Sequence, residues 1–261
     1  MNSHFNPGLQ VTIQHNPMGF AYGEGVFGPQ PEHRLLDAIR GSLLDERSEG
    51  PEIVYTIAMD VGKTEHRPLL QKKMLLFGIV TYAAGKIGRE PVRSQGHVHA
   101  VSKHSGWPPP ELYEIWEGKA IVYMQEAVAD DPGRCFAINA QAGDVVLVPP
   151  GWAHCTINAD PSFPMTFGAW CDREYAFEYD RVRAYHGLAW YPVLAEDGDI
   201  LWQRNEHYKS RELCCRQASP YSKFGLETGV PIYVQFERDP DKFQFISSPG
   251  IKEENWKHFE P

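Results

Sequence analysis

Short runs of β-branched, aromatic and aliphatic residues fill the middle of the chain and predict a mostly β structure. Turn residues separate several runs, and Asp130–Gly133 predicts a hairpin. The expected strands are Ile53–Met59, Met74–Tyr82, Leu112–Trp116, Ala120–Ala127, Cys135–Asn139, Val145–Val148 and Met165–Trp170. Many short strands with such punctuation are typical of a sandwich or a barrel.

The two ends of the chain have a different pattern. Residues 1–31 are rich in Gly, Pro, Asn and Phe without a steady period, which indicates an arm laid over a surface. Leucines and an isoleucine at helical spacing predict an amphipathic helix over Glu32–Arg47. Beyond residue 194, the runs Ile232–Phe236 and Phe243–Ile246 look strand-like. We therefore expect an arm and helix in 1–50, a barrel in 51–194 and a packed extension in 195–261.

Charge and cysteine usage narrow the possible partners. The chain has 25 basic and 34 acidic residues, a formal charge of −9, which disfavours a nucleic-acid-binding surface. Lys86, Arg89 and Arg93 still form a local basic cluster that would suit a phosphorylated substrate or a solvated strand edge. The five cysteines have no regular spacing, and no signal peptide or membrane-spanning run is evident. These features predict a cytoplasmic protein with no membrane partner.

One histidine pair has the spacing of metal ligands. His97 and His99 flank Val98, and side chains two apart in an extended segment share a face. Two imidazoles on a polar strand are also common as surface residues. A glutamate at 111 and a histidine at 154 add the partners that a metal site needs.

These residues stand in two patterns that resemble the cupin motifs. The stretch from Gly143 to Asn158 reads Gly-x5-Pro-x-Gly-x2-His-x3-Asn, and Glu111 is followed by Gly118 in the pattern Glu-x6-Gly. The first motif departs from the usual pattern, because the eleven residues Ala100–Pro110 stand between its second histidine and its glutamate. We expect this insertion to form an ordered loop at the mouth of a pocket and not to bind metal.

From about residue 54 to residue 193 the chain resembles the cupin-type glucose-6-phosphate isomerases best represented in archaea. The resemblance is carried by Thr81, Gly85–Glu90, Gly96–His99, Glu111–Tyr113 and Val148–His154. It implies a jelly-roll barrel, a cytoplasmic homodimer acting in glycolysis and gluconeogenesis, and a sugar phosphate substrate. It also implies a metal bound by His97, His99, Glu111 and His154, and substrate contacts from Thr81, Ser94, Gly96 and Tyr179.

The mixed nitrogen and oxygen ligand set decides which metals fit. It suits iron(II), which we favour, or manganese, zinc, nickel or cobalt, better than calcium or magnesium. Glu111 is the first choice for the catalytic base that moves a proton between C1 and C2 of the sugar. The competing interpretation is that Glu111 is only a ligand and that a hydride shifts or another residue transfers the proton. Tyr113, on the same face, would position Glu111 or a sugar hydroxyl, or would simply pack in the core.

Two other functions use the same residues. Cupin oxidases and dioxygenases have the same ligand set, and a regulatory cupin would bind a sugar without turnover. The elements Gly85–Glu90 and Ser94–Gly96 favour the isomerase, because the oxidases need not share them. We therefore predict an enzyme, a metal-dependent glucose-6-phosphate isomerase.

Overall fold

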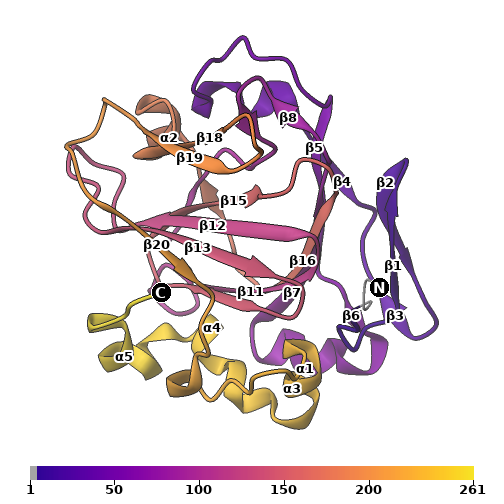
Figure 1. The fold of residues 1–261 in the computed structure, drawn as a ribbon. Helices are drawn as coiled ribbons and strands as arrows, with labels where there is room; N and C mark the ends of the chain where they lie inside the picture. The colour runs from indigo at the N-terminus through magenta and orange to yellow at the C-terminus, as the bar shows by residue number, and fades with distance from the viewer. Residues whose placement is uncertain (1–4) are drawn as a thin grey trace.

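Two facing β-sheets form the centre of the molecule in the computed structural model, which describes residues 5–261 (Figure 1). The larger sheet contains, in order, β14 (Val145–Val148), β11 (Glu111–Glu117), β16 (Met165–Asp172), β7 (Leu75–Tyr82), β5 (Ile53–Met59) and β4 (Glu32–Leu35). The smaller contains β15 (Ala153–Asn158), β12 (Lys119–Gln125), β13 (Cys135–Gln141) and β20 (Leu213–Gln217). All seven predicted strands are present, and the hairpin at Asp130–Gly133 joins β12 to β13.

Shorter elements surround the two sheets. Pairs of strands are β1 (Val11–His15) with β2 (Met18–Tyr22), β3 (Val26–Phe27) with β6 (Gly62–Lys63), β8 (Lys86–Ile87) with β9 (Glu90–Pro91), β10 (Val98–His99) with β17 (Phe177–Glu178), and β18 (Trp190–Leu194) with β19 (Ile200–Arg204). The α-helices are α1 (Arg67–Lys72), α2 (Asp180–Ala184), α3 (Ile232–Arg238), α4 (Gln244–Ser247) and α5 (Glu253–Lys257). Short 3-10 turns are η1 (Leu36–Ala38), η2 (Arg40–Ser42), η3 (Thr64–His66), η4 (Ser222–Phe224), η5 (Pro240–Phe243) and η6 (Pro249–Lys252).

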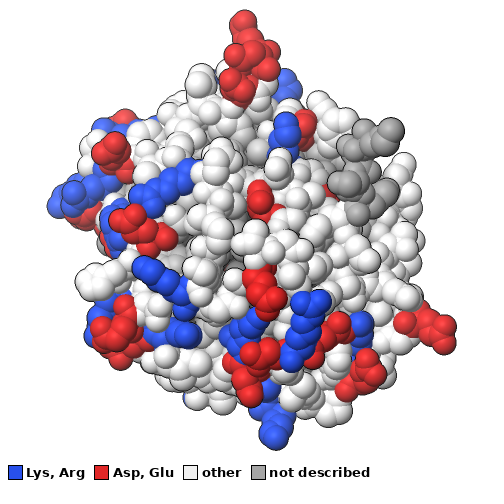
Figure 2. All heavy atoms as spheres, turned by 60° about the horizontal axis from the view of Figure 1, so that its bottom comes forward, with Lys and Arg blue, Asp and Glu red and all other residues white. Residues whose placement is uncertain are grey.

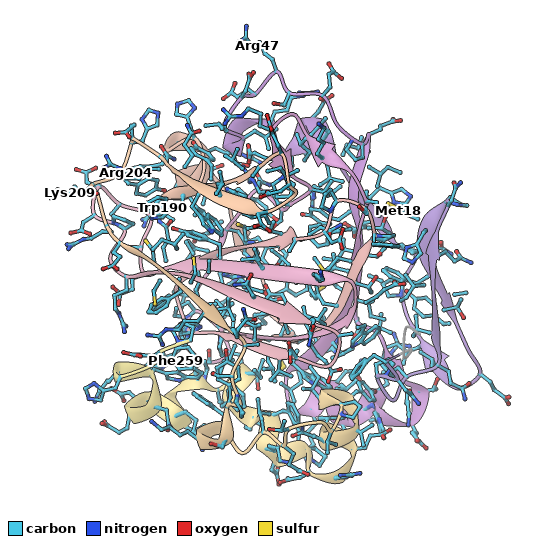
Figure 3. The ribbon with its side chains drawn as sticks, in the orientation of Figure 1. Met18, Arg47, Trp190, Arg204, Lys209 and Phe259 are labelled. Carbon is cyan, nitrogen blue, oxygen red and sulfur yellow. The ribbon has the colours of Figure 1, made fainter. Side chains whose placement is uncertain are left out.

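The alternation of side chains along each strand explains why the sheets face each other. In β11, Tyr113 and Ile115 point into the space between the sheets, whereas Leu112 and Trp116 belong to a separate core on the outer face. Side chains from both sheets fill the space between them (Figure 3). The hydrogen bonds that define these two sheets do not continue around both of them, so within residues 5–261 the expected jelly roll is an open double sheet, not a closed barrel.

The C-terminal segment is helical where strands were expected. Ile232–Phe236 lies in α3, and Phe243–Ile246 spans the end of η5 and most of α4, so both predictions were wrong. Ile232, Tyr233 and Phe236 are buried at positions i, i+1 and i+4, a helical spacing that a run of five residues does not separate from a strand. The helices lie along the lower side of the sheets in Figure 1, where Tyr233 stacks on Trp170 of β16.

The N-terminal segment also differs from the prediction. Glu32–Leu35 pairs with β5 as a strand, and the rest of the expected helix is the two turns η1 and η2. The helical spacing did identify the buried side chains, since Leu36, Ile39 and Leu43 are all in the core. The arm expected in 1–31 includes the β1–β2 hairpin, whose Phe20 packs on the outer face of the larger sheet. Residues 1–4 of that arm lie outside the described part of the chain.

Within residues 5–261, no helix is long and apolar enough to cross a bilayer. On the face that carries the C-terminal helices, acidic and basic side chains are intermingled (Figure 2). Ion pairs there join the extension to the segment that contains β6 and α1, for example Lys63 with Glu237 and Lys73 with Asp241.

A buried carboxyl group joins the larger sheet to helix α3. Glu114, on the outer face of β11, is 1% exposed. Its Oε1 accepts the backbone N–H of Ile232 at 2.8 Å, and its Oε2 accepts the indole N–H of Trp116 at 3.0 Å. Burial raises the pKa of this carboxyl to about 8, although both hydrogen bonds oppose the rise. The group is therefore a link between the extension and the sheet that keeps its proton at neutral pH and loses it near pH 8.

We expect the free energy of unfolding to fall as the pH rises from about 5 to about 8. The native state keeps a proton on Glu114 in this window, whereas the unfolded chain has released it. The contribution of Glu114 to the free energy of unfolding is fully present below the pKa that this carboxyl has in the unfolded chain. It is lost as the pH rises through the pKa in the folded protein. Between these two values each pH unit lowers the free energy of unfolding by about 1.4 kcal/mol, so the total loss is about 4 kcal/mol. Urea unfolding of wild type and Glu114→Gln across this range measures it, and the variant should lack this part of the pH dependence. Parallel curves would contradict the assignment.

Candidate metal centre and substrate pocket

Four side chains from three strands and the segment before β10 converge at one end of the double sheet. The ligand atoms of His97, His99, Glu111 and His154 all lie within 4.8 Å of one another. His97 Nε2 is 3.2 Å from His99 Nε2, and Glu111 Oε2 is 3.3 Å from the Nε2 atoms of His99 and His154. A backbone pair, with both N–H···O distances 3.0 Å, holds His97 beside His154. The spacing argument for a shared face of His97 and His99 therefore agrees with the structure.

Backbone carbonyl groups orient two of the imidazoles. Nδ1 of His99 is 2.8 Å from the carbonyl oxygen of Pro109, and Nδ1 of His154 is 3.1 Å from that of Trp152. A carbonyl oxygen only accepts, so each Nδ1 carries the hydrogen and each Nε2 points at the carboxylate. Nitrogen lone pairs and a carboxylate oxygen that converge in a buried site form the donor set of a divalent transition metal, and the carbonyl contacts are the outer support usual for such ligands. The residues present fit a metal.

The charge states of these groups also fit. Burial and the neighbouring imidazoles of His154 and His99 hold the pKa of His97 well below its usual range, which keeps the ring neutral. Burial on its own would raise the pKa of Glu111, but its hydrogen bonds and charge interactions with His154 and His99 hold that pKa well below the usual range. Neutral imidazoles and an ionised carboxylate are the forms that bind metal.

Two further side chains hold the carboxylate of Glu111. The hydroxyl of Tyr113 donates to Oε2 at 2.6 Å, and the thiol of Cys171 donates to Oε1 at 3.1 Å. Burial and the adjacent carboxylate raise the pKa of the Cys171 thiol well above its usual value, so it stays a neutral donor. The sequence analysis did not identify Cys171 as a site residue. The alternation of side chains along β16 could have done so, because Phe167, Ala169 and Cys171 all face inward.

A pocket opens from this cluster into the space between the sheets. Of the expected substrate contacts, Ser94, Gly96 and Tyr179 line it, as do Glu111 and Tyr113. Its remaining polar lining comes from Arg34, Tyr55, Tyr82, Gln95, His97 and Thr156. Gly96 has φ +87°, and a Cβ there would lie 2.9 Å from Leu188 Cδ1, so this position requires glycine.

Thr81 does not belong to the pocket. It alternates with Val80 and Tyr82, which face inward, and therefore points to the outer face of β7. Its hydroxyl accepts from Thr166 at 2.9 Å, and it is fully buried. The prediction that Thr81 contacts substrate was wrong, because a position one residue along a strand lies on the opposite face.

The basic residues that precede the histidines, Lys86, Arg89 and Arg93, also lie outside the pocket. Arg93 is buried in an ion pair with Glu90 at 2.6 Å and donates to the carbonyl of Ser42 at 2.6 Å, and Lys86 and Arg89 are exposed. None of the three lines the pocket. The interpretation of these residues as a solvated strand edge therefore holds for Lys86 and Arg89.

Comparison with known proteins decides the family. Residues 41–211 match the family model described as Glucose-6-phosphate isomerase (GPI). The chain belongs to the glucose-6-phosphate isomerase family. It is 27% identical over 184 residues to a glucose-6-phosphate isomerase of Pyrococcus abyssi (strain GE5 / Orsay), covering 68% of this chain and 87% of the relative. It is 26% identical over 191 residues to that of Pyrococcus furiosus, covering 70% and 91%.

Among solved structures, a recombinant oxalate oxidase in complex with glycolate matches with a TM-score of 0.34 and 12% identity. The match covers 46% of this chain and 52% of that chain. At this TM-score and identity, the match carries no information about the reaction of this chain.

No residue of the insertion Ala100–Pro110 lines the pocket, at whose mouth the loop was expected. Ser102 N–H donates to the Trp107 carbonyl at 2.9 Å, and the His104 N–H donates to Glu174 at 2.8 Å. The loop touches the candidate site through the carbonyl of Pro109, which accepts from His99. The insertion thus orients a ligand and does not form the pocket wall.

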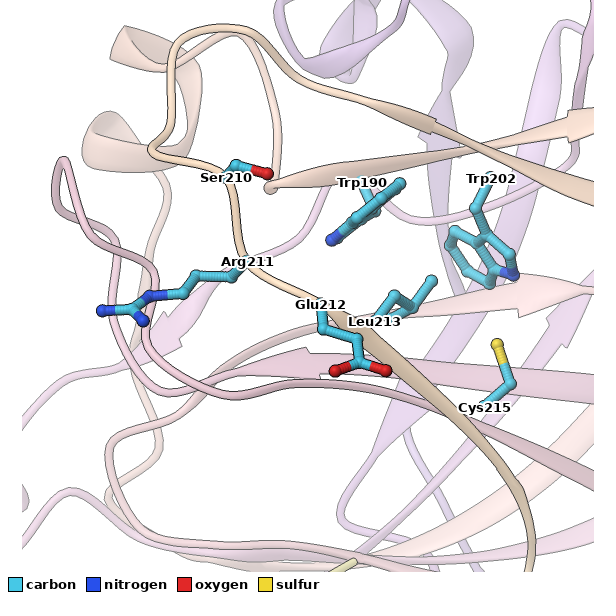
Figure 4. Close-up of a pocket in the computed structure, with 7 residues that line it drawn as sticks. All are labelled: Trp190, Trp202, Ser210, Arg211, Glu212, Leu213 and Cys215. Carbon is cyan, nitrogen blue, oxygen red and sulfur yellow. The ribbon is translucent and has the colours of Figure 1, made fainter.

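A second hollow lies on the surface beside β20 (Figure 4). Its lining is Trp190, Trp202, Ser210, Arg211, Glu212, Leu213 and Cys215. It contains one carboxylate and no imidazole, and Arg211 is already paired with Asp131. This hollow therefore lacks the cluster of imidazoles and carboxylate found at the pocket between the sheets.

Proposed function

We propose that this chain is a metal-dependent aldose–ketose isomerase that interconverts glucose 6-phosphate and fructose 6-phosphate, the reaction shared by glycolysis and gluconeogenesis. The observation that carries the proposal is the convergence of three imidazoles and one carboxylate at a pocket, in a member of the glucose-6-phosphate isomerase family. With it we propose a cytoplasmic homodimer.

His97, His99, Glu111 and His154 would hold the metal, and the mixed nitrogen and oxygen donors favour iron(II), with manganese, zinc, nickel and cobalt as alternatives. A bound metal would supply Lewis-acid stabilisation of charge that develops on the sugar oxygens.

The chain's own residues would transfer the proton and hold the substrate. Glu111, kept ionised, takes the proton from C2 of glucose 6-phosphate while O1 takes a proton from a water molecule, which gives an enediol. Return of the proton from Glu111 to C1, with transfer of the O2 proton to the hydroxide left by that water, completes the ketose. Tyr113 donates to Glu111 and so fixes the direction of its carboxylate. Ser94, Gly96 and Tyr179 line the pocket where the rest of the sugar phosphate would lie.

An assay of both sugar phosphates, with metal content measured on the same sample, tests the function. Protein stripped of metal and reloaded with iron(II) or manganese should interconvert the two sugars, and the stripped protein should not. Reloaded protein that binds metal but does not interconvert them would refute the isomerase. Oxygen consumption by the same sample would then favour the oxidase. Sedimentation of the reloaded protein measures whether it is a dimer.

A further inference from the structure

An arginine from outside the matched region stands in the pocket. Arg34 lies in β4, before the family match begins at residue 41, and pairs across the sheet with Tyr55 of β5. Its guanidinium carbon is 6.0 Å from the centre of the Tyr55 ring, and the residue lines the pocket. Its Nε is buried and has no hydrogen-bond acceptor within the described chain. A cationic donor is therefore available to a ligand.

Gln95 offers a second free donor. The residue is 2% exposed, and its Oε1 accepts from Nε of Arg183 at 3.1 Å. Because Arg183 only donates, this contact fixes which end of the amide is oxygen. The other end, Nε2, is buried without an acceptor in residues 5–261, although Gln95 lines the pocket. A buried donor left without a partner is destabilising, and an acceptor on a ligand would remove this cost.

Both donors line the pocket that also contains His97 and Glu111. Gln95 is two residues before His97, and the ring of Tyr179 lies close to both His97 and Arg183. The Tyr179 ring centre is 5.9 Å from that of His97 and 5.4 Å from the guanidinium carbon of Arg183. Glu111 is the single carboxylate in the pocket lining. The rest of the polar lining is hydroxyl, amide, guanidinium and the imidazole of His97, a set with several hydrogen-bond donors that suits an anion.

We propose that Arg34 and Gln95 bind the phosphoryl group of the substrate and make the enzyme select phosphorylated over neutral sugars. Arg183 is a positioning residue, since it acts by orienting the Gln95 amide. The inference rests on the proposed function and places the anion contact partly in the N-terminal segment, outside the part of the chain that matches the family. The phosphate contact expected from Thr81 is replaced by these residues.

Binding of inorganic phosphate to the metal-loaded protein, measured by calorimetry at constant ionic strength, tests the subsite without relying on turnover. Arg34→Met removes the cation. Gln95→Glu keeps the acceptor for Arg183 and puts a negative oxygen where the free donor was. Arg47→Met is the matched control, because it also removes one positive charge, its side chain is 92% exposed, and it projects from the outer edge of the molecule (Figure 3).

We expect Arg34→Met and Gln95→Glu each to weaken phosphate binding about tenfold or more, the usual effect of losing a charged hydrogen bond. Arg47→Met should bind like wild type, and Arg34→Lys should recover part of the affinity. With fructose 6-phosphate, KM should rise more than kcat falls. Phosphate affinity that is unchanged in both pocket variants, or absent in wild type, overturns the inference. Loss of phosphate binding in protein that never isomerises either sugar would support the subsite and refute the proposed function instead.

Discussion

Replacing His99 with alanine is expected to lower metal affinity by at least about 100-fold. Mutation of an outer residue that merely supports a ligand costs 10–100-fold, so removal of the ligand itself should cost more. The vacated site also leaves the Glu111 carboxylate, 6% exposed, without one of its two imidazole contacts. His97→Ala and His154→Ala should behave alike. Metal per chain, measured after equilibrium dialysis, gives the result, and isomerase activity should fall with occupancy.

His104→Ala is the matched control for this series. It makes the same chemical change on the exposed part of the Ala100–Pro110 loop, and its side chain is absent from the four-residue cluster. It should keep full metal content and activity. Full occupancy in any three of the variants His97→Ala, His99→Ala, Glu111→Ala and His154→Ala would show that the metal assignment is wrong.

The resemblance to the cupin motifs predicted that His97, His99, Glu111 and His154 would come together, and local geometry explains part of this clustering. His97 and His99 share a face whenever their segment is extended, and Pro149 and Pro150 end β14 and return the chain toward His154. Strands such as Val145–Val148 were found with the observed bounds for a similar reason, since apolar runs bounded by turn residues need no distant partner to be recognised.

Arg34 could not be found in this way. The role proposed for it depends on β4 pairing with β5, which places Arg34 opposite Tyr55, and on a pocket that Gln95 also lines. The leucines that follow Arg34 have helical spacing, and this pattern concealed a strand. A contact between residues far apart in sequence produces no periodic pattern along the chain. The burial of Leu36 and Ile39 was visible in the sequence, because these residues stand at helical spacing.

Glu111→Gln is expected to lower the isomerisation rate by about 10²-fold or more, because the amide keeps the shape of the side chain and loses the proton acceptor. One oxygen remains for a metal, and Tyr113 has an acceptor if the amide places its oxygen toward the hydroxyl. The metal content of this variant must equal that of wild type for the loss to be assigned to the base. A variant that keeps its metal and most of its rate would make Glu111 a ligand only.

Solvent exchange decides the same question in the unmodified enzyme. If Glu111 carries the proton between C1 and C2, some of it is replaced by deuterium from heavy water during turnover, and glucose 6-phosphate formed from fructose 6-phosphate carries deuterium at C2. Tyr113→Phe is the companion variant, since it removes the 2.6 Å hydrogen bond to the carboxylate and leaves the ring in the core. It should keep the exchange and lower the rate far less than Glu111→Gln. Product without deuterium would instead require direct transfer of hydrogen as hydride, with Glu111 confined to holding the metal.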